Sequence, residues 1–204
     1  MIGNSRPTRE RDRRGGFSLA ESLMVIAVLG IFLAISVPVV STVRNYARQV
    51  DSKMRYGQYL VALEAYRGEY GDYPEFLSEV RGESVNLNED NNWMKLMGAL
   101  GGGIFLENSV DQKFIQKWNP RRKKFYQFSD EEFLRDVSGM VIGLVDGFGN
   151  PNIKMIVEDE VSGYIDCSFL QKVDRKKRAK VMVPVVVYSL RADYSSGTNI
   201  LSYD

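Results

Sequence analysis

Apolar residues fill the chain from Phe17 to Val40, and Glu21 is the one ionisable side chain in that stretch. Because a bilayer-spanning helix needs about 20 consecutive apolar residues, the stretch predicts a membrane-spanning helix. A carboxylate inside such a segment costs roughly 2.5–3.5 kcal/mol and persists mainly where it has a partner. We therefore expect Glu21 to pair with a cation from another chain.

Beyond Pro38, apolar or small residues recur in steps of three or four, which is the period of a helix with one apolar face. These residues, named here the apolar stripe, are Val43, Ala47, Val50, Met54, Gly57, Val61 and Ala65. The spacing predicts that the helix continues to Tyr66 and buries the apolar stripe against a globular head. Four cations fall largely off the stripe, and we expect them on a solvated face, with pairing between subunits as the alternative: Arg44, Arg48, Lys53 and Arg55.

Helix breakers mark the passage from the long helix into the head. Gly68, Gly71 and Pro74 predict the end of the helix. Three tyrosines are expected to pack at this junction rather than to contact a ligand: Tyr66, Tyr70 and Tyr73. Further on, the sequence from Trp93 to Leu100 predicts a short helix that ends in a run of glycines.

Runs of β-branched and aromatic residues predict strands near the C-terminal end. These runs are Met140 to Val145, Ile153 to Val157, Tyr164 to Phe169 and Val181 to Leu190. Pro184 interrupts the last run, so that strand begins after the proline or lies at an edge. The expected fold class is α+β, with the second half of the long helix packed on a small antiparallel meander of three to four strands.

Composition favours one modest globular head and argues against catalysis. The chain has 204 residues, a formal net charge of +1 and no histidine, which removes Ser-His-Asp and Cys-His catalysis and the commonest zinc ligand. We expect no enzyme activity. The single cysteine, Cys167, cannot form an intramolecular disulfide.

Two basic runs raise the possibility of a nucleic-acid partner. Arg121–Lys124 precedes the aromatic residues Phe125, Tyr126 and Phe128, and a second run covers Arg175–Arg178. Basic residues interleaved with aromatic residues are typical of sites that bind single-stranded nucleic acid. We nevertheless expect a charged surface turn whose aromatics face the head, and a solvated hairpin tip, and we do not expect nucleic acid as a partner.

A basic leader precedes the apolar stretch. Residues 1–16 contain five arginines and end in Gly15-Gly16, a flexible and unbranched site for a protease. Two simpler interpretations stay open. A secretory signal peptide would be cut after its apolar core, near Ala34-Ile35-Ser36, although this core is too long. A plain signal anchor explains the arginines and the length, but not Gly16-Phe17 or Glu21.

The sequence Gly16-Phe17-Ser18-Leu19-Ala20-Glu21 resembles the leader junction of the type IV pilin and type II secretion pseudopilin superfamily. The resemblance runs from Arg13 to Pro74, where Tyr73-Pro74 is similar to the helix exit of secretion pseudopilins. It implies that a prepilin peptidase cuts after Gly16 and methylates the new amine of Phe17. It also implies that Glu21 and the helix-kinking Pro38 serve assembly.

Two C-terminal segments extend the resemblance. Asp146-Gly147-Phe148-Gly149-Asn150-Pro151 is similar to a turn of major secretion pseudopilins, with Gly147 and Phe148 in place of proline and tryptophan. The tail from Tyr188 to Ile200 resembles their calcium loop. That likeness implies a weak calcium site at Ser189, Leu190 and Asp193, which has few carboxylates for such an ion. Calcium is the only cofactor we consider.

These expectations define a domain plan. It comprises a cleaved leader (1–16), a transmembrane and assembly helix (17–40), an amphipathic helix (41–66) and a pilin-like head (67–204). The head divides into a variable αβ-loop region (67–138) and a β-sheet with a C-terminal loop (139–204).

The plan and the resemblance together predict a filament subunit for protein secretion. Subunits are expected to wait in a bacterial inner membrane with the head exported, and to assemble when the Phe17 amine of one chain pairs with Glu21 of another. The implied partners are further copies, other pseudopilins or pilins, the prepilin peptidase, an inner-membrane assembly platform and lipid. The alternatives are a type IV pilus subunit for adhesion, motility or DNA uptake, and a monomeric membrane-anchored binding module.

Overall fold

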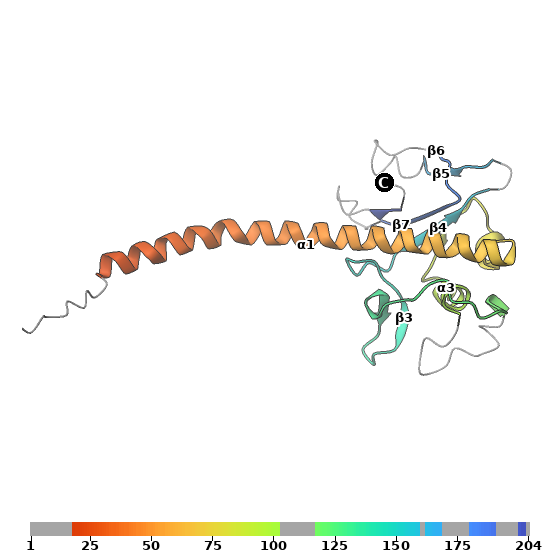
Figure 1. The fold of residues 1–204 in the computed structure, drawn as a ribbon, viewed down its shortest axis with the longest axis horizontal. Helices are drawn as coiled ribbons and strands as arrows, with labels where there is room; N and C mark the ends of the chain where they lie inside the picture. Colours follow the sequence, from red (N-terminus) through yellow and green to blue (C-terminus); the bar gives the residue numbers. More distant parts are fainter. Residues whose placement is uncertain (1–17, 103–116, 160–161, 169–179, 191–199, 203–204) are drawn as a thin grey trace, which may run out of the picture. The chain divides into compact units, whose positions relative to one another are not determined.

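The computed structural model describes residues 18–102, 117–159, 162–168, 180–190 and 200–202. It begins with a single long helix, α1 (Leu19–Tyr70), which continues through Pro38 (Figure 1). The chain divides into two compact units, Met1–Arg44 and Asn45–Asp204, and the boundary falls within α1. The second unit is the globular head, and it includes the C-terminal half of α1.

The end of α1 lies four residues beyond the expected Tyr66. Gly68 stays inside the helix, and the stop comes at Gly71, whose φ of 88° is left-handed and whose N–H donates to the Arg67 carbonyl at 2.8 Å. A glycine adopts this conformation without a steric penalty, which is why helices often end there. Pro74 follows, and the short helix α2 (Glu75–Ser78) begins directly after it.

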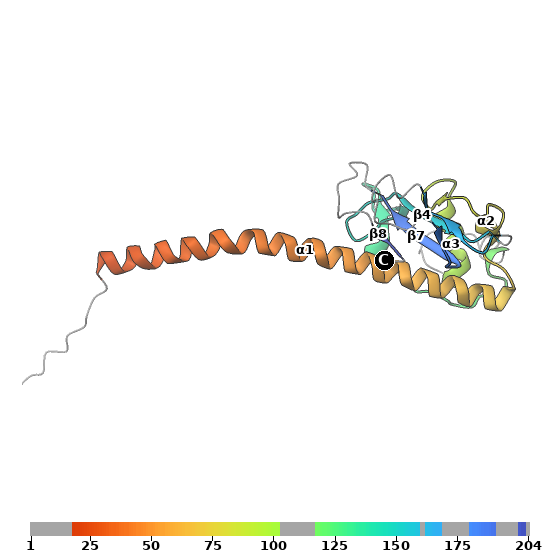
Figure 2. The ribbon, with the colours of Figure 1, turned by 90° about the horizontal axis from the view of Figure 1, so that it is seen from above.

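The expected helix from Trp93 to Leu100 is confirmed as α3 (Asn92–Gly101), and Gly102, with a φ of 70°, ends it. The strands of the head are short, as Figure 2 shows. Their bounds are β1 (Val85–Asn86), β2 (Phe133–Arg135), β3 (Val141–Leu144), β4 (Ile153–Val157), β5 (Ile165–Asp166), β6 (Lys180–Val181), β7 (Val185–Ser189) and β8 (Ile200–Leu201). A 3-10 turn, η1 (Asp130–Glu132), leads into β2.

The expected α+β class is confirmed, but the strands do not form one meander. The main sheet has four antiparallel strands in the order β1-β4-β7-β8, while β2 pairs with β3 and β5 pairs with β6 in separate two-stranded sheets. The predicted strand Val181 to Leu190 is split, and β7 begins directly after Pro184. Proline lacks the N–H that a central strand needs, so the break falls there.

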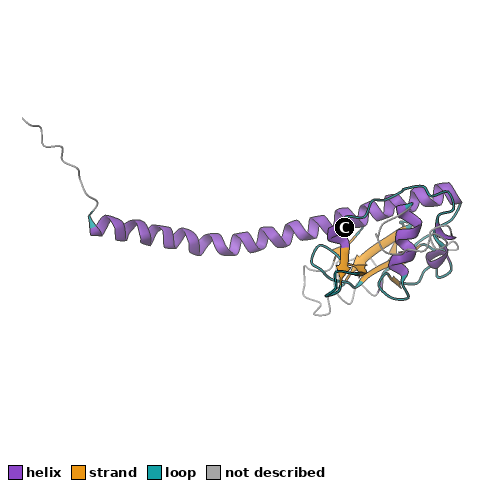
Figure 3. Cartoon of the chain, turned by 90° about the horizontal axis from the view of Figure 1, so that it is seen from below, coloured by secondary structure: helices purple, strands orange, loops and turns teal. Residues whose placement is uncertain are grey.

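Both faces of the main sheet are buried. Alternate residues of β4 and β7 point to opposite sides, and each side is covered by its own apolar cluster. One face packs on α1 and α3 through Met155 and Val187 (Figure 3). The other face packs a smaller cluster in which Ile156 and Val186 meet Ile165 of β5. All five residues of β7 are buried for this reason.

Candidate assembly surface

The N-terminal end of α1 is closed by a reciprocal pair of hydrogen bonds. The Ser18 N–H donates to the Glu21 carboxylate at 2.8 Å, and the Glu21 N–H donates to the Ser18 hydroxyl at 3.2 Å. This is a capping box, which the pattern Ser-x-x-Glu could have indicated and which the sequence reasoning missed. Glu21 therefore has a partner within its own chain. The predicted cleavage and methylation residues, Gly16 and Phe17, lie outside the described residues.

The first half of α1 is long and apolar enough to cross a membrane. Its large apolar side chains are exposed throughout, from Leu19 and Leu23 to Phe32 and Val40. Exposed leucine, isoleucine and phenylalanine on every side of a helix are typical of a segment surrounded by lipid or by other helices. The chain thus carries one candidate membrane span within the part that the structure describes.

The apolar stripe is a real feature of α1, but the prediction that the head buries it is wrong. Val50, Met54 and Val61 are 46%, 56% and 71% exposed, and Ala47 and Ala65 are exposed as well. Successive helical residues turn by about 100°, so these positions share one side of the helix. An apolar face of the head segment of α1 is therefore left uncovered.

Tyrosines, instead, form the buried face of α1. Tyr56, Tyr59 and Tyr66 pack with Leu63 and Ala62 in the main core. Their spacing of three, four and seven residues places them on one helical face, roughly opposite the apolar stripe. Helical spacing in the sequence pointed only to the apolar stripe, and the tyrosine face was missed, although tyrosine rings supply large apolar surfaces to a core.

The tyrosines at the end of α1 pack as expected. Tyr66 is buried against Tyr70 and Phe125, and its hydroxyl donates to the Trp118 carbonyl at 2.7 Å. Tyr73 lies buried in the same core.

The turn that resembles the pseudopilin motif attaches the β3–β4 connection to α1. The Gly147 N–H donates to the Ser52 hydroxyl at 2.8 Å, and Ser52 is fully buried. A Cβ at Gly147 would lie 2.6 Å from the Arg48 carbonyl oxygen. Glycine stands here because the turn approaches the helix backbone closely.

Asp146 holds the same turn together from within. Its buried carboxylate accepts hydrogen bonds from the N–H groups of Phe148 and Asn150, at 2.8 and 2.9 Å, and from the Ser189 hydroxyl at 2.7 Å. A buried carboxylate is tolerated where donors satisfy it, as here. The motif therefore ties together α1, the β3–β4 turn and β7.

Two of the three residues suggested for calcium are engaged in protein contacts. Ser189 is the donor to Asp146, and the Leu190 carbonyl accepts from the side-chain amides of Asn150 and Asn152 at 3.3 and 3.4 Å. The third residue, Asp193, lies outside the described residues. Among the described residues, no group of three or more histidine, cysteine, aspartate or glutamate side chains is placed to hold a metal ion.

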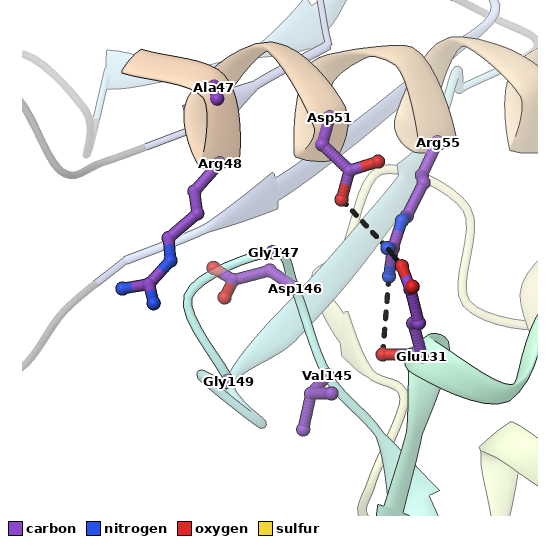
Figure 4. Close-up of a pocket in the computed structure, with 9 residues that line it drawn as sticks. All are labelled: Ala47, Arg48, Asp51, Arg55, Glu131, Val145, Asp146, Gly147 and Gly149. Carbon is purple, nitrogen blue, oxygen red and sulfur yellow. Dashed lines mark hydrogen bonds and ion pairs between the residues drawn. The ribbon is translucent and has the colours of Figure 1, made fainter. Parts of the chain in front are cut away.

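Arg55 lies on the head side of α1, so the prediction of a solvated position is wrong for this cation. Its buried guanidinium pairs with Asp51 at 2.7 Å and with Glu131 at 3.1 Å (Figure 4). These groups and the motif turn line an open cavity of about 380 Å³, where Arg48 and Asp146 also lie. The cavity is lined by charges of both signs, and the Arg55 pairs fix η1 beside the helix.

A buried carboxylate strengthens the same attachment. Glu132 is 1% exposed, and it accepts hydrogen bonds from the Tyr59 and Tyr126 hydroxyls and from the N–H and hydroxyl of Ser129. Burial raises the pKa of the Tyr59 phenol well above its usual value, and the adjacent Glu132 carboxylate raises this pKa further. The phenol therefore stays protonated and keeps donating.

The basic run Arg121–Lys124 is tied to α1. Arg121 and Lys123 both pair with Glu69, and these two cations hold the pKa of the Glu69 carboxyl below its usual value. The aromatics that follow face the head, as expected, with Phe128 in the core. The second run, Arg175–Arg178, lies outside the described residues.

Comparison of the chain with protein-family models, with curated proteins and with solved structures yields no match.

Proposed function

We propose that the chain is the structural subunit of a type II secretion pseudopilus-like filament, anchored in a bacterial inner membrane before assembly and carrying an exported head. The observation that carries this proposal is the exposed apolar stripe of α1, which the same chain carries in addition to a membrane-length apolar stretch. Large exposed apolar faces on a folded chain mark interaction sites.

The arrangement of α1 favours a polymer over an isolated anchor. An anchor needs only the apolar stretch, because a helix of about 20 residues already spans a bilayer. The stripe is a further uncovered apolar surface, on the part of α1 that belongs to the head, where Val61 is 71% exposed, and an isolated anchor has no use for it. Packing the apolar stretches of several copies against one another would cover them in a helical bundle, and contacts between heads would cover the stripe.

Glu21 supplies the proposed switch between waiting and assembly. In the described chain its carboxylate is held by Ser18. After cleavage before Phe17, a neighbouring subunit would offer an ammonium group to the same carboxylate, and the pairing would offset the burial of both charges.

The test uses the full chain expressed with a prepilin peptidase. Intact mass is expected to show loss of residues 1–16 and gain of one methyl group at Phe17. Glu21→Ala is expected to insert into membranes normally but to yield no sheared filaments, and Val61→Asp is expected to have the same effect. Met182→Asp, at an exposed apolar residue directly after β6, is the matched control and should assemble.

Retention of Met1, or cleavage after the apolar segment, would refute both the prepilin-type leader and the filament proposal. Absence of filaments from the correctly cleaved wild-type chain would leave a monomeric anchored module as the better account. Assembly that survives both Glu21→Ala and Val61→Asp would refute the assembly surface proposed here. Filaments that support adhesion, motility or DNA uptake, without secretion, would move the chain to the type IV pili.

A further inference from the structure

The β2–β3 hairpin carries a second uncovered apolar surface on the head. Val137 is fully exposed at the tip of this hairpin, and Met140 and Ile142 are 66% and 47% exposed. We call these three residues the hairpin tip. Three large apolar side chains exposed within six residues are not needed for the hairpin itself, because Val141 and Leu144 provide its buried contacts.

The hairpin tip is held rigidly in its outward position. The Asp136 carboxylate accepts hydrogen bonds from the N–H groups of Ser138 and Met140, both at 2.9 Å, and Arg135 donates to the Gly139 carbonyl at 2.8 Å. At its base, the hairpin is anchored to α1 through Glu132 and η1. A preordered projection loses little conformational entropy when it docks, so it suits a contact surface.

We infer that the hairpin tip of one subunit docks on the apolar stripe of α1 in a second copy of this chain. This inference rests on the filament proposed above and specifies one of its contacts. A polymer with a repeating head-to-tail contact needs two different, complementary surfaces on each subunit. The head segment of α1 and the hairpin tip are two such uncovered apolar surfaces.

A second copy is required because the hairpin cannot cover the stripe of its own chain. Glu131 and Glu132 tie the base of the hairpin to Arg55 and Tyr59, which lie on the head side of α1. Met54 lies roughly opposite Tyr56 and Tyr59 on the helix, since each residue turns the helix by about 100°. The stripe thus faces away from the hairpin that shares its chain.

Charge favours the same pairing. Residues 43–61 contain four cations and one carboxylate, whereas residues 129–145 contain four carboxylates and one arginine. The Arg55 pairs use part of this difference within each subunit, but Arg48 stays exposed near the stripe and the half-buried Asp136 lies beside the hairpin tip. Hydrogen bonds from Ser138 and Met140 hold the pKa of Asp136 below its usual value, so its charge persists at mildly acidic pH. Opposite charges around an apolar contact favour the correct register.

Disulfide crosslinking of sheared filaments tests the contact. The double variant Met54→Cys with Met140→Cys is expected to give a ladder of crosslinked multimers on oxidation, because each subunit then offers one cysteine to each neighbour. Either single variant can give dimers at most. The native Cys167 is fully buried and does not take part. Met54→Cys with Met182→Cys is the matched control, and it should give no ladder.

A second measurement uses no cysteine. Met140→Asp is expected to lower the filament yield about tenfold or more, since burial of a methionine side chain is worth at least that factor in an association constant. Head folding should stay unchanged, because the side chain is exposed. Filaments without a Met54–Met140 ladder, or with an equal ladder for Met182, would overturn the docking contact and leave the filament proposal intact. Absence of any wild-type filament after confirmed cleavage would overturn both.

Discussion

Removal of the Tyr59 hydroxyl tests how the head is fixed to α1. Tyr59 is 1% exposed and donates to the buried Glu132 carboxylate. A hydrogen bond to a charged group contributes about 1.5–3 kcal/mol to stability. Tyr59→Phe is therefore expected to lower the free energy of unfolding by that amount. For a domain of this size the midpoint temperature should fall by roughly 3–12 °C.

Glu132→Ala should cost more, because it leaves the hydroxyls of Tyr59, Tyr126 and Ser129 without their acceptor. Each buried polar group left unsatisfied costs about 1–3 kcal/mol, and the partly buried members recover some of this from water, so we expect about 3–5 kcal/mol in total. The double variant Tyr59→Phe with Glu132→Ala should then show a coupling free energy of about 1.5–3 kcal/mol between Tyr59 and Glu132.

Tryptophan fluorescence during thermal unfolding of the full chain in mild detergent measures these effects. Trp93 and Trp118 both lie in the core of the head, so the signal reports that unit. Tyr46→Phe is the matched control on the same helix, because Tyr46 is exposed, and it should change stability by less than about 0.5 kcal/mol. A coupling below about 0.5 kcal/mol between Tyr59 and Glu132 would refute the role given to this carboxylate.

Two further measurements examine the close approach of the motif turn and the buried phenols. Gly147→Ala should destabilise the head by roughly 1–3 kcal/mol in the same fluorescence assay, because the new Cβ would lie 2.6 Å from the Arg48 carbonyl oxygen. A Cβ at Gly68 meets nothing within 4 Å, so the control Gly68→Ala should stabilise the head by about 0.5–1 kcal/mol. Equal effects of the two substitutions would contradict the close contact at Gly147. Burial raises the pKa of Tyr66 from 10.0 to about 12, so its stabilisation should be complete below pH 10 and lost as the pH rises through 12. Phenolate absorbance followed with fluorescence should show this, and ionisation of every tyrosine near pH 10 without unfolding would count against it.

Local patterns in the sequence predicted the elements whose signals are strong within a few residues. The β-branched run Ile153–Val157 is β4 over the same bounds, and the glycines after Leu100 end α3 where expected. The shortest strands left no such signal. β1 has two residues, and its pairing with β4 depends on contacts distant in sequence. β2 has three residues, and its pairing with the nearby β3 shifts register between Leu134 and Arg135.

The assembly surface shows where periodicity stops being informative. The apolar stripe was identified correctly as one face of α1, but the head is placed on the tyrosine face, because burial depends on the shape of the partner as well as on helical spacing. Arg55 was misplaced for the same reason, since its partner Glu131 is 76 residues away. The capping box of Ser18 and Glu21 had a local signature and could have been found from sequence.

The attachment of the head along α1 has a mechanical consequence. Three contacts join successive turns of the helix to the head: Ser52 with Gly147, Arg55 with Glu131, and Tyr59 with Glu132. A pull along the helix axis loads all three in shear, so they share the load instead of opening one after another as they would in peeling. Tension on the apolar half of α1 should therefore drag the folded head along, and unfolding of the head should require loss of several contacts together.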